Sequence, residues 1–267
     1  MMTTAQLRRS VYSYYKREGR HTLPWRQTHD PYAVMVSELM LQQTQVPRVI
    51  PKYEAFMKRF PTVQSLARAE LGAVLVLWQG LGYNRRAKML HSAARAIVAR
   101  GGVFPSTKEE LVMLPGVGPY TASAILAFAY NAPTVLIETN VRTVYIHHFF
   151  VDKTGVADSE LLPLIEKTMD TKNPREWYAA LMDYGSHLKQ TVGNVNKKSA
   201  QYVRQSKFKG SNREVRGAIV RLLAQKSPAT LRTILTETGF PKELTRAQLS
   251  ALLKEGLIKK VRQRYTL

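Results

Sequence analysis

Apolar residues recur every three or four positions along most of this chain, the spacing that places them on one face of an α-helix. The recurrence is clearest between residues 66 and 97. The alternation of apolar and polar residues that is typical of a half-buried strand is scarce before residue 255, and no internal repeat is present. We therefore predict an all-α body.

Short loops separate the predicted helices. Ser106 and Thr107 stand before Glu109 and Glu110, an arrangement typical of a helix that begins with a capping box. We predict that this helix ends near residue 113. Glycine and proline mark predicted loops at residues 80–82, 101–102, 115–118 and 173–174.

Residues 211–267 have the pattern of a separate unit. Helical stretches are predicted at 213–225, after the Ser227–Thr230 cap and at 244–255, and residues 257–267 can fold back as a β-hairpin. Three helices and a terminal hairpin describe a winged helix. The unit carries 12 Lys+Arg and 4 Asp+Glu. Its third helix, with Arg246, could enter a DNA groove, or the unit could serve only as a packing or partner module.

The charge of the chain predicts a polyanionic partner. It has 40 Lys+Arg against 19 Asp+Glu, a net charge of +21, and nucleic acid is the first candidate. Between Lys189 and Lys209 there are six basic residues and no acidic ones. We interpret 189–210 as a basic linker that is either a solvated surface segment or a strip that follows DNA phosphates; Lys197 and Lys198 lie in it.

Composition excludes several other classes of protein. The chain has no cysteine, which excludes disulfides, thiolate-held clusters and a cysteine nucleophile. The six histidines form no pattern of metal ligands. No apolar run approaches the length of about 18 residues that a membrane span needs, and no secretory signal is visible. We predict an intracellular, DNA-associated protein of the cytoplasm, nucleoid or nucleus that has no metal and is a monomer.

The segment Leu114–Gly118 is the most informative local motif. Glycines at alternating positions allow a sharp turn before a helix that begins near Tyr120, and exposed backbone N–H groups at a helix start can hold a phosphate. A Gly-x-Gly turn alone is usually just a connector. In a helical chain of this charge it indicates a helix-hairpin-helix DNA clamp.

Two glutamates are candidate catalytic groups. Glu38 sits in an apolar helical stretch, where burial favours the protonated carboxyl and suits it to donate a proton; the alternative is a carboxylate paired with an arginine. Glu138 follows an apolar run and precedes Thr139 and Asn140, so it is either a catalytic carboxylate or a helix-capping one. Gln42 and Gln43 could hydrogen-bond base edges or lie on a solvated surface.

Six segments occur in an order and spacing that resemble the helix-hairpin-helix DNA glycosylases, and most closely the MutY-type adenine glycosylases. The segments are LPWR, DPY, SELMLQQTQV, WQGLGYNRRAKML, LPGVGPYTASAI and ETNVRTV. The resemblance covers about residues 5–187. It implies a two-lobed helical fold, with a six-helix barrel over 28–133 and a second lobe formed by 1–27 and 134–188. It also implies that the target nucleotide is rotated out of the duplex.

The resemblance also implies roles for individual residues. Glu38 matches the general acid that protonates adenine, and Glu138 the carboxylate that stabilises the sugar cation. Tyr120 stands where bifunctional relatives carry a Schiff-base lysine, and a phenol cannot form an imine. Trp25, Arg26, Leu41 and Asp183 match the adenine pocket, and Gln43 and Tyr83 match residues inserted into the duplex. The remaining predicted DNA contacts are Gln42, Thr44, Gly116, Val117, Gly118 and Arg142, the last being equally well a surface charge.

The chain departs from the family pattern in three places. Glutamate replaces the usual aspartate at Glu138, and a shift of about 1.5 Å in a carboxylate can cost roughly 100-fold in rate. The cysteines of the family's [4Fe–4S] cluster are absent, so we predict no cofactor. A winged-helix-like unit stands where a MutT-like domain is usual, which leaves the preferred opposite base open.

These observations predict a monofunctional glycosylase of base excision repair that removes adenine opposite 8-oxoguanine or G, without strand cleavage. One alternative is a thymine glycosylase that acts on G·T mispairs. The other is a catalytically attenuated protein that binds mismatches or lesions. The paired glutamines favour the adenine enzyme.

Overall fold

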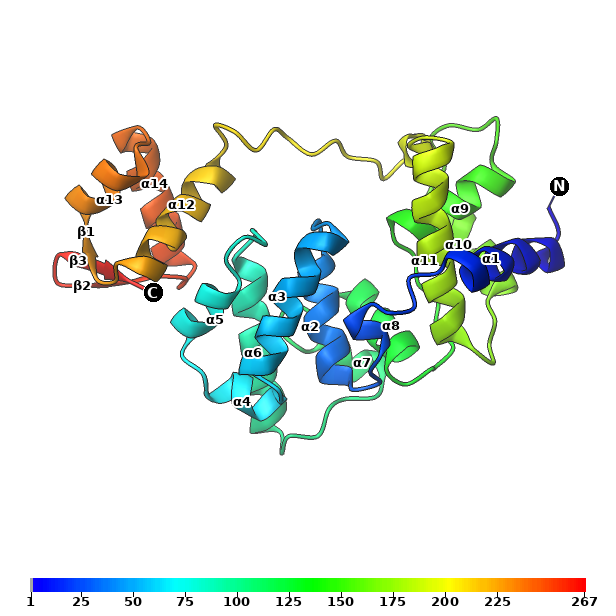
Figure 1. Ribbon diagram of the computed structural model, residues 1–267, viewed down its shortest axis with the longest axis horizontal. Helices are drawn as coiled ribbons and strands as arrows, with labels where there is room; N and C mark the ends of the chain where they lie inside the picture. The colour runs from blue at the N-terminus through cyan, green and yellow to red at the C-terminus, as the bar shows by residue number, and fades with distance from the viewer. Residues whose placement is uncertain (1) are drawn as a thin grey trace. The chain divides into compact units, whose positions relative to one another are not determined.

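The computed structural model describes residues 2–267, and its helices and strands are labelled in Figure 1. These residues separate into two compact units that we treat one at a time. Unit 1 contains residues 2–35, 105–113 and 117–204. Unit 2 contains residues 36–104, 114–116 and 205–267. The predicted all-α body is confirmed: strands occur, in the described residues, only after residue 228.

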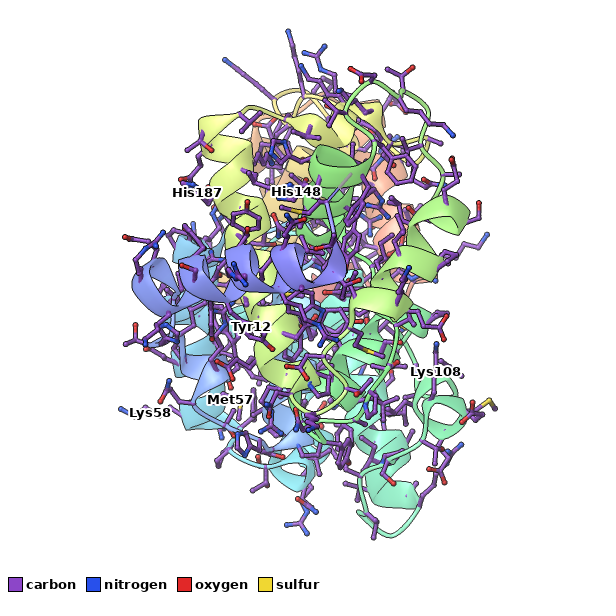
Figure 2. The ribbon with its side chains drawn as sticks, turned by 90° about the vertical axis from the view of Figure 1, so that its right-hand side faces the viewer. Tyr12, Met57, Lys58, Lys108, His148 and His187 are labelled. Carbon is purple, nitrogen blue, oxygen red and sulfur yellow. The ribbon has the colours of Figure 1, made fainter. Side chains whose placement is uncertain are left out.

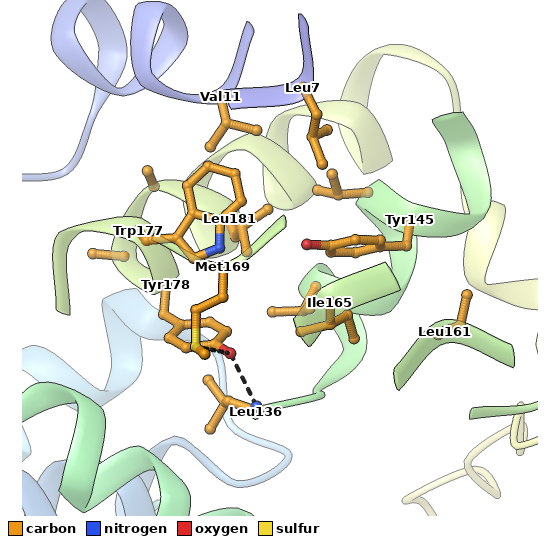
Figure 3. Packing of buried hydrophobic residues seen from close by; sticks show 14 of the residues in the cluster. Leu7, Val11, Leu136, Tyr145, Leu161, Ile165, Met169, Trp177, Tyr178 and Leu181 are labelled. Atoms are coloured by element: carbon orange, nitrogen blue, oxygen red, sulfur yellow. Dashed lines mark hydrogen bonds between the residues drawn. The ribbon is translucent and has the colours of Figure 1, made fainter. Parts of the chain in front are cut away.

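The helices of unit 1 surround one apolar core. Its elements are α1 (Thr4–Glu18), η1 (Pro24–Arg26), α7 (Lys108–Val112), α8 (Pro119–Phe128), α9 (Thr139–Phe149), α10 (Asp158–Thr168), α11 (Pro174–Thr191) and η2 (Val195–Lys198). α11 packs along α9 and α1, and Leu7, Val11 and Trp177 are fully buried where these helices meet (Figure 3). The Tyr178 hydroxyl accepts a hydrogen bond from the Leu136 N–H at 3.1 Å, so the core also fixes the segment before α9 (Figure 3).

The first part of unit 2 is a set of short helices with an aromatic core. Phe56 lies against Phe60 and Trp78, with ring centroids 5.1 and 6.2 Å apart, and all three rings are buried. α4 and α5 both pack on α6. The elements are α2 (Pro31–Leu41), whose first turn belongs to unit 1, α3 (Val46–Arg59), α4 (Val63–Arg68), α5 (Leu71–Leu77) and α6 (Arg85–Ala99).

The second part of unit 2 has the three helices and the terminal hairpin predicted for residues 211–267, and α12 of this part packs on α5. It consists of α12 (Asn212–Gln225), β1 (Ala229–Thr230), α13 (Leu231–Thr238), α14 (Lys242–Lys254), β2 (Lys259–Val261) and β3 (Arg264–Thr266). The sheet is antiparallel with the order β1-β3-β2, one strand more than predicted. β1 is only two residues long, too short to show an alternating pattern.

The predicted positions of three helix ends are confirmed, but the capping box expected at α7 forms only in part, because the Glu110 carboxylate accepts from the Thr107 hydroxyl and not from its backbone N–H. The Thr107 side chain accepts a hydrogen bond from the Glu110 N–H and begins α7, and Thr230 caps α13 in the same way through Thr233. α14 ends at Lys254, just before Gly256. No helix among residues 2–267 combines the length and the apolar character that crossing a membrane requires.

Candidate active site and nucleic-acid interface

Helix α2 carries Glu38 inside unit 2. The helix is apolar on all sides, and Val36, Leu39 and Met40 are almost wholly buried. The Glu38 side chain belongs to the same buried set, at 6 % exposure. A buried titratable group in an apolar helix is a candidate functional group. The predicted burial of Glu38 is confirmed.

Arg86 fixes the C-terminal end of α2, although nothing in the sequence pattern marks it for this role. Its Nη1 donates to the carbonyls of Leu39 and Met40 at 2.7 and 3.1 Å, and its Nη2 donates to those of Leu81 and Gly82 at 3.0 and 3.1 Å. The last carbonyls of a helix have no partner within the helix, so a guanidinium there replaces a C-cap. Burial lowers the pKa of Arg86 to about 10. One side chain thereby ties α2 to the loop before α6.

Gln43 and Tyr83 lie in two neighbouring loops, where both are exposed and have a strained backbone. Their φ angles are +54° and +47°, in the left-handed region, which costs a residue with a side chain about 1–2 kcal/mol. Tyr83 is 38 % exposed. Gln205 Nε2 donates to both of them, to Gln43 Oε1 at 3.2 Å and to the Tyr83 hydroxyl at 2.5 Å. Arg213 Nη1 donates to the same hydroxyl at 2.7 Å.

These loops line a cavity of about 640 Å³ that lies wholly within unit 2. Three of the predicted contacts with DNA bases, Gln42, Gln43 and Tyr83, are on its wall. Thr44 is close to them and donates to the Gln42 carbonyl at 3.2 Å, and Leu41 ends α2 partly exposed. The other lining residues are Leu39, Gly82, Asn84, Arg85, Arg86, Met89, Gly116, Arg213, Arg216, Gly217 and Glu255.

The turn between α7 and α8 requires only one of its two glycines. Gly116 has φ +77°, and a Cβ there would stand 2.4 Å from the Cβ of Met89. Gly118, in contrast, has φ −83°, begins α8 as its N-cap, and would place a Cβ in open space. The Val117 side chain is buried, so only its backbone is left to meet a ligand. This geometry leaves the N-terminal end of α8 uncovered at Gly118.

In unit 1, Glu138 is the N-cap of α9. Its Oε1 accepts hydrogen bonds from the backbone N–H groups of Asn140 and Val141 at 2.7 and 2.9 Å. Burial raises the pKa of this carboxyl, and the hydrogen bonds and Arg142 oppose that rise only in part. The Glu138 side chain therefore has the geometry of a helix cap, the alternative role that the sequence suggests. Tyr120, in the first turn of α8, is partly buried and packs against the core of unit 1.

Arg26 and Asp183 form a buried ion pair. Arg26 Nη1 lies 2.7 Å from Asp183 Oδ2, and its Nη2 lies 3.0 Å from Oδ1. The backbone N–H of Arg20 donates to Oδ2 at 2.8 Å, and the Arg20 side chain also pairs with this carboxylate. Burial pulls the pKa of Asp183 upward, but Arg26 and Arg20 outweigh it, and the net pKa is below its usual value. Trp25 precedes Arg26 in η1 and is partly exposed.

The other predicted DNA contacts differ in whether their charged groups already have a partner within the protein. Arg142 donates to both oxygens of Asp158 at 2.7 and 2.8 Å, so its guanidinium is already paired. Lys198 Nζ donates to the Val151 carbonyl, whereas Lys197 is exposed. The half-exposed Arg246 lies 4.0 Å from Glu243 on α14.

The family model and the curated relatives identify the family of this chain. Residues 36–167 match the model of the HhH-GPD superfamily base excision DNA repair protein. The adenine DNA glycosylase of Mycolicibacterium smegmatis is 33 % identical over 261 residues, covering 90 % of this chain and 88 % of that protein. The chain belongs to the adenine DNA glycosylase family. Among other relatives so named, that of Buchnera aphidicola subsp. Baizongia pistaciae is 36 % identical over 190 residues, 69 % of this chain, and the human one is 39 % identical over 192 residues, 67 % of this chain.

The coverage of these adenine DNA glycosylases is unequal. The chain spans about half of the Buchnera protein, 53 %, and 35 % of the human one.

Solved structures agree on the fold. A thermostable thymine-DNA glycosylase has a TM-score of 0.60 at 23 % identity, over 68 % of this chain and 86 % of that one. A non-covalent endonuclease III–DNA complex has a TM-score of 0.54 at 19 % identity, over 72 % and 87 %.

The iron–sulfur cluster implied by the resemblance to this family does not fit the residues of this chain. Such a cluster is held by cysteine thiolates, and the chain has none. The segment after α11 closes instead by backbone hydrogen bonds: the Val156 N–H donates to the Lys198 carbonyl, and the Ala200 N–H to the Val156 carbonyl, both at 2.9 Å. Asn196 is buried in this segment, and η2 contacts α9.

Histidines in this family member form an aromatic cluster in unit 1. His148 and His187 are labelled in Figure 2. His148 Nε2 lies 3.1 Å from the Tyr184 hydroxyl, and the ring of His187 stacks on Tyr14 with centroids 4.6 Å apart. Burial, and then the charge of His147, lowers the pKa of His148 to about 4, so its ring is neutral at pH 7. Within residues 2–267, no three His, Asp or Glu side chains are grouped as metal ligands.

Proposed function

We propose that this protein is a monofunctional DNA glycosylase that removes mispaired adenine, opposite 8-oxoguanine or G, from duplex DNA. One observation carries the proposal: the almost wholly buried Glu38 on α2, within the region that matches the repair superfamily. The similarity to adenine DNA glycosylases over 90 % of the chain, and the net charge of +21, support the same reaction and the same polyanionic substrate.

Glu38 supplies the proton that adenine needs in order to leave. The base is a poor leaving group as an anion, and proton transfer to N7 lets it depart as the neutral molecule. As the bond between C1′ and N9 breaks, a water oxygen bonds to C1′. The proton that this water loses restores the acid. The products are free adenine and an abasic site.

Glu138 stabilises the positive charge that develops on the sugar. A carboxylate fixed by two backbone N–H groups cannot swing away as the charge forms, which is the property that electrostatic stabilisation requires. Tyr120 offers no amine to C1′, so no imine forms and the strand is not cut. Trp25, Arg26, Asp183 and Leu41 are the proposed contacts to the adenine base.

DNA is held through its phosphates and opened at the target. Backbone N–H groups at Gly118 and the start of α8 bind a phosphate with the help of the helix dipole, and Gly116 makes the turn that presents them. Gln43 and Tyr83 enter the duplex in place of the rotated nucleotide. Gln42, Thr44, Lys197 and Arg246 add contacts to DNA.

The protein acts as a monomer at the DNA and without the iron–sulfur cluster of the family. The absence of thiolate ligands supports the second point, and the backbone closure of residues 195–200 on Val156 gives that segment a fixed shape of its own. The protein is intracellular and associated with DNA, in the cytoplasm or nucleoid or in a nucleus.

A base-release assay tests the proposal. Single-turnover reactions on duplexes with A·8-oxoguanine, A·G and T·G mispairs, followed by alkaline cleavage of abasic sites, should show loss of adenine alone. Glu38→Gln should abolish the release and leave the affinity for DNA unchanged. Release of thymine from T·G would instead identify a thymine glycosylase. Tight binding of mispairs without any release would identify a mismatch-binding protein.

A further inference from the structure

Two residues beyond the region matched by the superfamily model lie on the proposed duplex-entering side chains. Gln205 hydrogen-bonds both Gln43 and Tyr83, and Arg213, in the first turn of α12, hydrogen-bonds Tyr83. The Arg213 guanidinium carbon also lies 5.7 Å from the centroid of the Tyr83 ring. A base that comes to rest beside Tyr83 therefore meets Arg213.

The cavity beside Tyr83 has a wall built by the winged-helix-like unit. Arg213, Arg216 and Gly217 of α12 form this wall, and the loops of Gln43 and Tyr83 face it. At Gly217 a Cβ would find nothing within 4 Å, so the glycine leaves the cavity open on that side. A volume of about 640 Å³ accommodates a nucleobase.

The charges around the cavity are not equally available. Arg216 is held by Glu255 at 2.7 Å, and Arg86 is used by backbone carbonyls. Arg213 has only neutral partners: the Tyr83 hydroxyl, and the carbonyl and hydroxyl of Ser206 at 2.6 and 3.1 Å. The ion pairs found among residues 2–267 do not include it. Its guanidinium can therefore exchange these neutral partners for an acceptor on a ligand.

We propose that this cavity takes the base opposite the excised adenine, and that Arg213 reads it as a guanine-type purine by donating to its O6 atom. An arginine guanidinium matches the acceptor edge of guanine, and a good contact of this kind is worth about 1–3 kcal/mol of discrimination. Gln205 positions Gln43 and Tyr83 beside it. The inference rests on the proposed function, because it takes the opposite base to be the one left unpaired when adenine is rotated out.

Base analogues test the O6 contact atom by atom. Adenine is placed opposite guanine, opposite inosine, which keeps O6 but lacks the 2-amino group, or opposite 2-aminopurine, which lacks O6. The wild-type protein should bind and process the guanine and inosine duplexes about 10-fold better than the 2-aminopurine duplex. In Arg213→Ala the ratio of the guanine or inosine duplex to the 2-aminopurine duplex should fall to about 1. Binding and processing of the 2-aminopurine duplex should not change. Arg221→Ala, on the same helix but outside the cavity, is the matched control and should keep the preference.

Two results would overturn the inference. Equal preference ratios in Arg213→Ala and wild type would show that Arg213 does not read O6. An equal gain on all three duplexes would show that Gln205 and Arg213 merely cover Gln43 and Tyr83 before DNA binds. The same ratios are measured by equilibrium binding to duplexes with an uncleavable adenine analogue. This second readout separates a failure of the inference from a failure of the proposed glycosylase activity.

Discussion

The carboxylate of Glu138 accepts a hydrogen bond at 2.7 Å from the backbone N–H of Asn140, two residues further along the chain. A second bond, from Val141 at 2.9 Å, makes the same oxygen the cap of α9. Capping and catalysis are compatible here, because a cap satisfies backbone donors with a carboxylate that stays charged. The length of the glutamate side chain sets where this charge stands in front of the helix.

Shortening this side chain should therefore cost rate rather than stability. Glu138→Asp keeps a good capping residue but withdraws the carboxylate towards the backbone, and displacement of a reacting group by about 1 Å can cost roughly 100-fold in rate. We expect adenine release to slow by about that factor in single-turnover assays. The thermal midpoint should stay within a few degrees of wild type. A faster variant would mean that glutamate attenuates the natural enzyme.

The pH profile of the reaction should report on the same group. Burial raises the pKa of Glu138 above its usual value, so the ionised form is lost at a higher pH than for an exposed glutamate. Since the ionised form stabilises the sugar cation, the rate should fall as the pH drops through this raised pKa. We expect an acid limb in single-turnover rates that Glu138→Gln removes along with most of the activity. A rate that stayed flat down to pH 4 would contradict this assignment.

The Arg26–Asp183 pair should matter more for folding than for chemistry. Loss of one partner of a buried ion pair typically costs about 3–5 kcal/mol, and since Arg20 is partly solvated we expect the lower end for Asp183→Asn in urea unfolding. The pKa of Asp183 is lowered in the folded state, so the stabilisation is present above the unfolded pKa of about 3.9 and is lost as the pH falls through the folded pKa. The difference between variant and wild type should be constant from pH 7 to 5 and shrink below about 4. The control is Glu166→Gln, an exposed substitution that should leave the free energy of unfolding unchanged.

The two glycines of the hairpin should separate stability from DNA binding. Gly116→Ala forces a side chain into the left-handed region and against Met89, so we expect a loss well above about 1 kcal/mol in the free energy of unfolding. Gly118→Ala meets no neighbour and should cost under about 1 kcal/mol. Its methyl group would stand in front of α8, where we propose that phosphate binds. Electrophoretic mobility shifts should therefore show that Gly118→Ala binds duplex DNA more weakly than the wild type. The small loss of stability would not account for this loss of affinity.

The features that the sequence predicts correctly depend on contacts between residues close together in the chain. The Thr107 cap, the buried Glu38 and the turn at Gly116 each depend on spacing within a few residues, and each was predicted. Arg86 and Gln205 were missed because their partners are far away: Arg86 reaches back 47 residues to Leu39, and Gln205 reaches 162 residues to Gln43. The periodicity of apolar residues gives no information about contacts between residues so far apart in the chain. The choice between cap and catalyst at Glu138 stayed open for another reason, since one carboxylate can do both.

Lys197 offers a test of the basic segment 189–210. The residue is exposed, whereas the adjacent Lys198 donates to the Val151 carbonyl, so the two lysines should respond differently to substitution. Each phosphate contact contributes about −0.9 to the slope of log K against log salt concentration. Lys197→Glu should therefore lower the affinity for duplex DNA and flatten this slope by about 1, with thermal stability unchanged. Lys167→Glu, an exposed charge reversal at the end of α10, controls for net charge alone. Equal slopes for Lys197→Glu and Lys167→Glu would show that the segment is a solvated surface and does not follow the phosphates.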